Sequence, residues 1–135
     1  MTLSDKVAAI TGAGSGMGRA TAQLFAERGA DVAVIDLDSD AAAKTASAIN
    51  DAEDSVSAIS ITADVSDTDD VAAFVEQTVA EFGRIDILHN NAGIPQQSNP
   101  VEEVTEETWD QIQDVNLKSA FLGTKHAVPY MRDQE

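Results

Sequence analysis

A glycine-rich segment at residues 11–18 constrains the fold of this chain more than any other feature. It reads Thr-Gly-Ala-Gly-Ser-Gly-Met-Gly and lies between a short apolar run at residues 7–11 and a helical pattern at residues 17–28. The common Gly-x-Gly-x-x-Gly spacing fails in both frames, because Met17 and Arg19 occupy the position of the third glycine, and no Gly-Lys-Ser/Thr follows for a P-loop. The spacing that fits is Thr-Gly-x-x-x-Gly-x-Gly, which uses Gly12, Gly16 and Gly18.

This spacing favours a dinucleotide-binding turn. Glycines permit a tight turn and a close approach of backbone to ligand, and the amides at the start of the following helix can receive a pyrophosphate. The alternative is a glycine-rich turn that binds nothing.

An acidic residue at the end of the next apolar run supports the first interpretation. Asp36 closes the run at residues 31–36 and lies 24 residues after Gly12, near the roughly 20-residue spacing at which a carboxylate accepts hydrogen bonds from an adenosine ribose. Its charge would repel a 2′-phosphate, and neither Ser15 nor Leu37 supplies a cation that would reverse the preference. Arg19 is the one basic residue close in sequence to the glycine-rich segment that could favour a 2′-phosphate. The pattern favours NAD over NADP as cofactor.

Short apolar runs alternate with helical spacing along the whole chain, which predicts a parallel sheet with crossover helices. Predicted strands cover residues 7–11, 31–36, 56–63 and 85–89. Each run is bounded by turn residues and is apolar enough to be buried on both faces.

Residues at helix ends give further predictions. Gly29 suits a left-handed cap after the helix at 17–28, Ser39 or Asp40 can cap the next helix, and Ser66 with Asp69 resembles a capping box. A last helix is expected from Thr105 towards Met131, bent or ended by Pro129.

Two stripes run along this last helix. One is largely apolar and the other is made of small residues that would let a helix or a sheet approach closely. The apolar stripe comprises Leu117, Phe121, Thr124 and Val128, and the small stripe comprises Ala120, Gly123 and Ala127.

The charge balance is strongly acidic, with 24 acidic residues against 8 basic ones and a net charge of −16. Such a surface repels nucleic acid and anionic membranes, so neither is expected as a partner. Because molar salt shortens the Debye length to about 3 Å, this composition suits a protein from a salt-rich cytoplasm. An acidic enzyme from an ordinary cytoplasm is the alternative.

Other compositional features exclude several classes of protein. No apolar run approaches the roughly 20 residues of a membrane helix, and no secretory signal pattern is present, so the prediction is a cytoplasmic protein. The chain has no cysteine, which excludes disulfides, thiolate metal sites and cysteine nucleophiles, and no metal site is predicted.

Four motifs in order resemble those of the short-chain dehydrogenase/reductase family. They are the Thr11–Gly18 glycine motif, Asp64-Val65 after the third predicted strand, Asn90-Asn91-Ala92-Gly93 after the fourth, and Asn116 within Val-Asn-Leu. Taken singly, Asp64 could be a carboxylate at a strand end, Asn90 and Asn91 could form a turn, and Asn116 could be a polar interruption of a helix. Together they are specific, and the resemblance extends over essentially the whole chain but only the first half of the family's domain.

The resemblance implies a fold and a set of roles. The fold is α/β, a Rossmann-like doubly wound parallel sheet with strand order 3-2-1-4 in three α/β/α layers, truncated before the fifth strand. In the family, the Asp64 position binds the adenine amino group, the Asn-Asn-Ala-Gly segment lines the cofactor cleft, and the Asn116 position orders a water in the proton relay. The expected cofactor-binding residues are Gly12, Ser15, Gly16, Met17, Gly18, Asp36, Leu37, Asp64, Val65, Asn90, Asn91, Ala92 and Gly93.

The family's catalytic serine and Tyr-x-x-x-Lys are absent from this sequence. Its one tyrosine is Tyr130, and the residue four positions later is Gln134 rather than lysine. The resemblance therefore implies hydride exchange between NAD(H) and an alcohol or carbonyl compound in a longer form, and an inactive chain of 135 residues. Only residues 94–100 are expected near a substrate.

Two other functions remain open, namely a non-catalytic NAD-binding or regulatory module and a structural fragment without a ligand. A single dinucleotide-binding domain over residues 1–135 would leave a strand edge and an apolar helix face unpaired. We therefore expect either a fragment of a longer protein or a homo-oligomer formed through the helix at 105–131 or the edge of the fourth strand.

Overall fold

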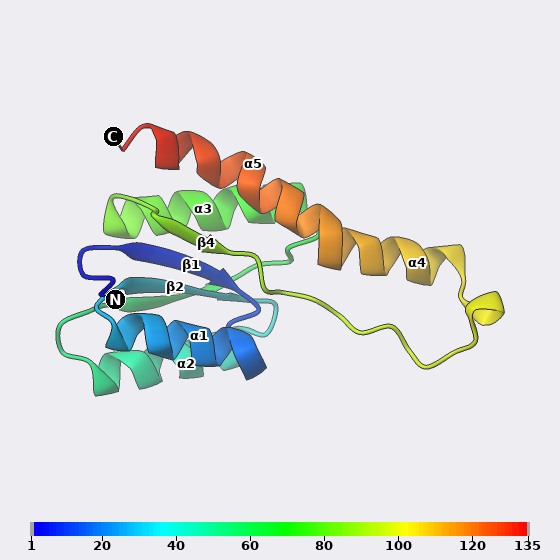
Figure 1. Cartoon of the computed structure of the whole chain (residues 1–135), viewed down its shortest axis with the longest axis horizontal. Helices are drawn as coiled ribbons and strands as arrows, with labels where there is room; N and C mark the ends of the chain where they lie inside the picture. The colour runs from blue at the N-terminus through cyan, green and yellow to red at the C-terminus, as the bar shows by residue number, and fades with distance from the viewer. Residues whose placement is uncertain (1, 135) are drawn as a thin grey trace.

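Four short strands pair in parallel in the computed structural model, which describes residues 2–134. The sheet order is β3-β2-β1-β4, as predicted, and Figure 1 shows α1 and α2 on one face with α3 and α5 on the other. The strands are β1 (Val7–Thr11), β2 (Asp31–Asp36), β3 (Ala58–Thr62) and β4 (Ile87–His89). The helices are α1 (Gly16–Glu27), α2 (Ser39–Ala52), α3 (Thr68–Phe82), η1 (Val101–Glu103), α4 (Glu106–Gln113), η2 (Asp114–Lys118) and α5 (Ser119–Arg132).

Two of the strands, β3 and β4, are shorter than predicted, and hydrogen bonding explains where they begin. Ile85 is fully buried, but its backbone N–H and C=O bond the side-chain amide of Gln134 at 2.7 and 3.0 Å rather than another strand. At the start of β3, the N–H of Ser57 donates to the carboxylate of Asp31. Just before β3 and just before β4, side chains therefore bond backbone groups that a neighbouring strand would otherwise pair.

The core has two halves, one on each face of the sheet. Successive residues of a strand point to opposite faces, so Ala8 and Ile10 belong to one half and Ala9 to the other. Alanines of α1 and α2 fill the first half, whereas Phe74 and Leu122 bring α3 and α5 into the second. Burial on both faces is what a parallel sheet requires.

Asp38 caps α2 and Asp67 caps α3, which corrects the predicted caps, namely Ser39 or Asp40 for α2 and Ser66 for α3. The Asp38 carboxylate accepts from the N–H of Ala41 at 3.0 Å, and Asp67 accepts from two amides of the next turn. Ser66 instead donates its hydroxyl to Asp64. Thr105 caps α4 through the N–H of Thr108, and Gly29 adopts the left-handed conformation after α1, both as predicted.

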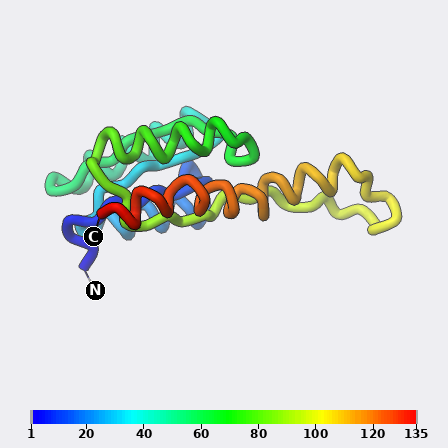
Figure 2. The backbone as a smooth tube through the Cα atoms, turned by 90° about the horizontal axis from the view of Figure 1, so that it is seen from above, coloured from blue at the N-terminus to red at the C-terminus, as the bar shows by residue number. Residues whose placement is uncertain are grey.

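The predicted last helix is interrupted and extends away from the sheet. A π-helical turn, η2, separates α4 from α5, and Figures 1 and 2 show α4 projecting beyond the layers beside the chain that leads to it. Pro129 does not end α5, which continues to Arg132. The carbonyl that loses its partner belongs to Lys125, an exposed residue.

The two stripes of α5 have different environments. Gly123 and Ala127 are buried, and a Cβ on Gly123 would lie 3.2 Å from the Leu88 side chain, so the small stripe lets the helix approach β4. Leu117 and Phe121 of the apolar stripe are 65% and 62% exposed. Across residues 2–134, no helix has the length and apolar character needed to cross a membrane.

An acidic side chain ties β1 to the segment before β4 at the amino ends of the strands. Asp86 accepts from the N–H of Val7 at 2.9 Å and from the guanidinium of Arg84, and its carboxylate lies 3.6 Å from the Lys6 ammonium. Burial raises the pKa of Asp86, but the hydrogen bonds from Arg84 and Val7 and the two positive charges outweigh burial and hold the pKa below its ordinary value.

This pKa predicts how stability depends on pH. A carboxyl whose pKa is lower in the folded than in the unfolded chain stabilises the fold fully above about pH 4 and loses that contribution as the pH falls through the folded pKa. We expect Asp86→Asn to lower the urea midpoint at neutral pH and to flatten its decline under acid conditions. Asp51→Asn, at an exposed position of α2, is the matched control and should change the free energy of unfolding by less than about 0.5 kcal/mol. Equal acid sensitivity of wild type and Asp86→Asn would refute this role.

Candidate functional site

The glycine-rich turn leaves the amino end of α1 open. Ser15 stands at the N-cap but makes no side-chain capping bond, so the first amides of the helix are left for another acceptor. Gly16 has a φ of +53°, and a Cβ built on it would meet no atom within 4 Å. The turn therefore offers an open, backbone-lined surface at the positive end of the helix dipole, which suits an anion.

Close backbone packing fixes the position of this turn. A Cβ on Gly18 would lie 2.2 Å from the carbonyl oxygen of Gly12, which no side chain could tolerate. Gly12 itself has a φ of +65° and packs against the backbone of Ala92. These contacts bring the start of α1, the end of β1 and the segment after β4 together.

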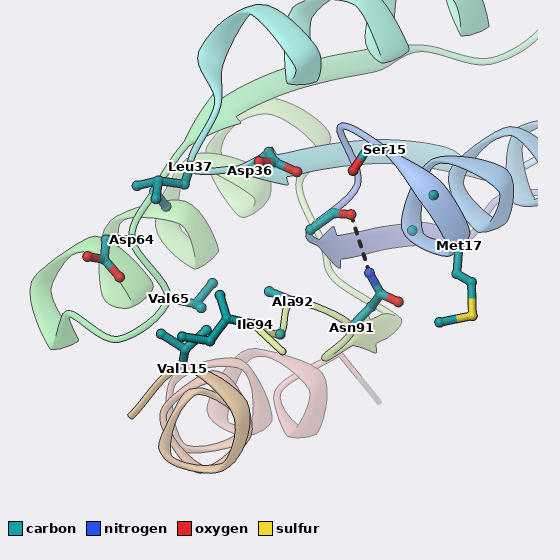
Figure 3. A pocket seen from close by; sticks show the side chains of 15 residues that line it. Ser15, Met17, Asp36, Leu37, Asp64, Val65, Asn91, Ala92, Ile94 and Val115 are labelled. Atoms are coloured by element: carbon teal, nitrogen blue, oxygen red, sulfur yellow. Dashed lines mark hydrogen bonds between the residues drawn. The ribbon is translucent and has the colours of Figure 1, made fainter. Parts of the chain in front are cut away.

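A buried hydroxyl connects β1 to the segment after β4. Thr11 is 3% exposed, and its Oγ1 accepts from the N–H groups of Asn91 and Ala92, each at 3.0 Å. The Asn91 side-chain amide in turn donates to the carbonyls of Thr11 and Gly12 at 3.0 and 3.3 Å; the second bond is drawn in Figure 3. The Asn-Asn-Ala-Gly segment is thereby held beside the glycine-rich turn.

Asp36 lies at the carboxyl end of β2 with both carboxylate oxygens held by backbone amides. The N–H of Gly14 donates to Oδ2 at 2.8 Å, and the N–H of Asp38 donates to Oδ1 at 3.0 Å. Each oxygen retains further capacity to accept a hydrogen bond. The carboxylate is a fixed acceptor at the edge of the cleft.

Asp64 and Val65 follow β3 at the same edge of the sheet. Asp64 Oδ1 accepts from the N–H and the hydroxyl of Ser66 at 2.9 and 2.6 Å, and its own N–H donates to Asp70. Val65 is 8% exposed. The loop after β3 therefore presents an oriented carboxylate beside an apolar side chain.

These elements enclose a cleft of about 390 Å³ at the carboxyl ends of the strands (Figure 3). Of the thirteen cofactor-binding residues expected from the sequence, all but Asn90 line it. Met17 and Leu37 form exposed apolar parts of its wall, at 81% and 70% exposure. Among residues 2–134 no cluster of His, Asp or Glu could hold a metal ion.

Comparison with known proteins agrees with this geometry. Residues 6–135 match the family described as "short chain dehydrogenase". The chain belongs to the short-chain dehydrogenase family. Levodione reductase of Leifsonia aquatica is 39% identical over 131 residues, covering 97% of this chain and 49% of that protein. Tropinone reductase-like 1 of Erythroxylum coca is 44% identical over 135 residues, covering 98% and 48%.

Solved structures of this family have the same fold. A 3-ketoacyl-(acyl-carrier-protein) reductase from Brucella melitensis, complexed with NADH, has a TM-score of 0.91 and 41% identity over 98% of this chain and 52% of that one. A crystal structure of levodione reductase has a TM-score of 0.92 and 39% identity, covering 97% and 51%. The chain thus spans about half the length of these relatives.

Two of the residues expected from the family motifs lie outside the cleft lining. The Oδ1 of Asn90 approaches Gly123, where a Cβ would lie 2.6 Å away, so Asn90 meets α5. Asn116 bonds both backbone groups of Ile94, accepting from its N–H at 2.8 Å and donating to its C=O at 2.9 Å. In this structure Asn116 holds the chain after Gly93 against η2.

Three residues that line the cleft were not among the expected cofactor-binding positions: Ala63, Ile94 and Val115. Ala63 directly precedes Asp64, and Ile94 directly follows Gly93, so strand-end position alone could have indicated them. Val115 lies in η2. Its contribution depends on how the last helix crosses the sheet, which no local pattern specifies.

The Thr11 hydroxyl yields a test of how this site is built. Thr11→Val keeps the shape of the side chain but removes the acceptor of two amides, and an unsatisfied buried amide costs about 1–3 kcal/mol. We expect Thr11→Val to lower the free energy of unfolding by at least about that amount, measured by urea denaturation. Thr11→Ser retains the hydroxyl and should recover most of the loss. Equal stability of the two variants would show that the hydroxyl is not what holds the segment after β4.

Proposed function

We propose that this chain forms the NAD-binding half of a short-chain dehydrogenase/reductase that exchanges hydride with an alcohol or carbonyl substrate in a full-length form. The observation that carries the proposal is a single cleft in which the open amino end of α1 meets the amide-held carboxylate of Asp36. A dinucleotide has a pyrophosphate and an adenosine ribose that match these two features.

The residues present fit such a cofactor. The amides from Gly16 to Gly18 would receive the pyrophosphate, because the empty space beside Gly16 leaves the backbone accessible. Asp36 would accept from the ribose hydroxyls, and Asp64, Val65 and Leu37 would surround the adenine. When bound, the nicotinamide ring supplies or takes up the hydride.

The charge of the cleft supports NAD over NADP. The N–H groups of Gly14 and Asp38 orient the Asp36 carboxylate, and its negative charge would repel a 2′-phosphate. Within residues 2–134, the cleft lining includes neither lysine nor arginine. Arg19, which directly follows the glycine-rich segment in sequence, is exposed and lies outside that lining.

The one tyrosine of this sequence is not placed in the cleft. Tyr130 lies on α5, is 37% exposed and does not line the cleft. Gln134, four residues later, bonds the backbone of Ile85. We therefore propose that catalysis requires a serine and a Tyr-x-x-x-Lys outside these residues, and that the chain alone does not turn over substrate. In this proposal Asn116 keeps its place in the proton relay.

A cofactor titration tests the proposal. We expect saturable binding of NADH to this chain, followed by nicotinamide fluorescence and calorimetry, with NADPH bound more weakly. Removing a charged acceptor costs about 1.5–3 kcal/mol, so Asp36→Ala should weaken NADH binding about tenfold or more. Asp40→Ala removes the same charge from the first turn of α2, outside the cleft lining, and should leave binding nearly unchanged. Absence of NADH binding in the wild type would favour the structural-fragment alternative.

We also propose that the chain is adapted to high salt. With a net charge of −16, most carboxylates cannot be paired one-to-one with a basic side chain, so their repulsion opposes folding in dilute buffer. We expect the melting temperature to rise as KCl increases towards about 1 M, where the Debye length is about 3 Å. Sucrose at matched osmolarity controls for non-ionic stabilisation. A melting temperature that is flat or falls with KCl would favour an ordinary acidic enzyme.

Self-association through the helix at 105–131 is part of the proposal. Trp109, Leu117 and Phe121 are each more than half exposed, and such apolar side chains favour contact with a partner. The edge of β4 is a second candidate surface, although Gln134 covers its start. A cytoplasmic location stays a prediction from composition.

A further inference from the structure

Gly14 packs directly against the carboxylate of Asp36. It is buried, it donates its N–H to Oδ2, and it is not among the residues that line the cleft. A Cβ built on Gly14 would lie 2.9 Å from Oδ2 of Asp36 and 2.8 Å from Cβ of Ala41. The position has no room for even a methyl group.

Only one of these two neighbours can move easily. Ala41 belongs to the first turn of α2, where its N–H is tied to the Asp38 cap at 3.0 Å, and a Cβ has no torsion that would take it away. The Asp36 carboxylate lies at the end of a rotatable side chain. A methyl group at residue 14 would therefore displace the carboxylate and break its bond to the residue 14 amide.

Backbone strain does not account for glycine at this position. Gly12 and Gly16 have φ values of +65° and +53°, whereas Gly14 is not among the glycines with positive φ. An alanine can adopt the Gly14 backbone, so its effect would come from the space that its methyl group occupies.

We propose that Gly14 is a specificity-determining position for the cofactor, because its missing side chain keeps the Asp36 carboxylate where it accepts from a ribose and repels a 2′-phosphate. This inference rests on the proposed NAD-binding function. Gly14 is a positioning residue, since it acts through Asp36 rather than by touching the cofactor.

The test compares the preference for NADH over NADPH in the wild type, in Gly14→Ala and in Gly14→Ala combined with Ala41→Gly. A displaced charged acceptor should lower the ratio of the two affinities about tenfold in Gly14→Ala. The second substitution removes the immovable neighbour, so the double variant should recover most of the ratio. A general loss of stability would weaken both cofactors alike and leave the ratio unchanged. A wild-type ratio in Gly14→Ala, or a double variant as unselective as the single one, would overturn the proposal.

Amide hydrogen exchange tests the Gly14–Asp36 bond without cofactor. Exchange at the Gly14 amide should be slower in the wild type than in Asp36→Ala, because the carboxylate protects that N–H, and equal rates would overturn the proposal. If the wild type bound no dinucleotide but Gly14 were protected, the proposed function would fail while the positioning of Asp36 by Gly14 stood. The exchange comparison uses only the wild type and Asp36→Ala, so it can overturn the proposal even if Gly14→Ala fails to fold.

Discussion

The candidate site depends on the contact between the end of β1 and the segment that follows β4. Gly18 lies so close to the Gly12 carbonyl that no side chain fits between them, and Thr11 and Asn91 join the same backbone by hydrogen bonds. Any larger residue at these glycines would separate α1 from the sheet, and with it the open helix end from the rest of the cleft. The glycines are therefore needed first for packing, and the open helix end that we propose to bind an anion follows from that packing.

The two ends of the sheet perform different tasks. At the amino ends of the strands, Asp86 gathers Arg84, Lys6 and the Val7 amide into a closed cluster whose acceptors are used within the protein. At the carboxyl ends, helix amides and carboxylate lone pairs are oriented by neighbours but keep capacity for a ligand. This asymmetry is what parallel strands allow, because all helix N-termini that follow the strands point to one edge.

The resemblance to the family predicted the sheet order and most of the residues that line the cleft. These residues come together because the carboxyl ends of parallel strands meet at one edge of the sheet. The predicted helix caps were wrong where several neighbouring side chains could cap the same helix. Asp38 caps α2 although Ser39 and Asp40 are equally good cap types, and Ser66 bonds Asp64 rather than starting α3. The start of β4 and the π-helical turn at Asp114–Lys118 depend on contacts with residues far away in sequence, namely Gln134 with Ile85 and Asn116 with Ile94. No periodicity in a short window contains that information.

The negative charge of the molecule opposes an anionic cofactor at long range but not at contact distance. A net charge of −16 repels an anion at long range, but salt at about 1 M screens charges beyond about 3 Å. The contacts proposed for the cleft are made at hydrogen-bond distance by backbone amides, which carry no net charge and are oriented by the fold. At that salt concentration, screening would remove much of the repulsion and leave the proposed binding contacts nearly intact. An acidic surface and the proposed anion-binding turn are compatible in one protein because the surface charge acts over many ångströms and the turn acts only on contact.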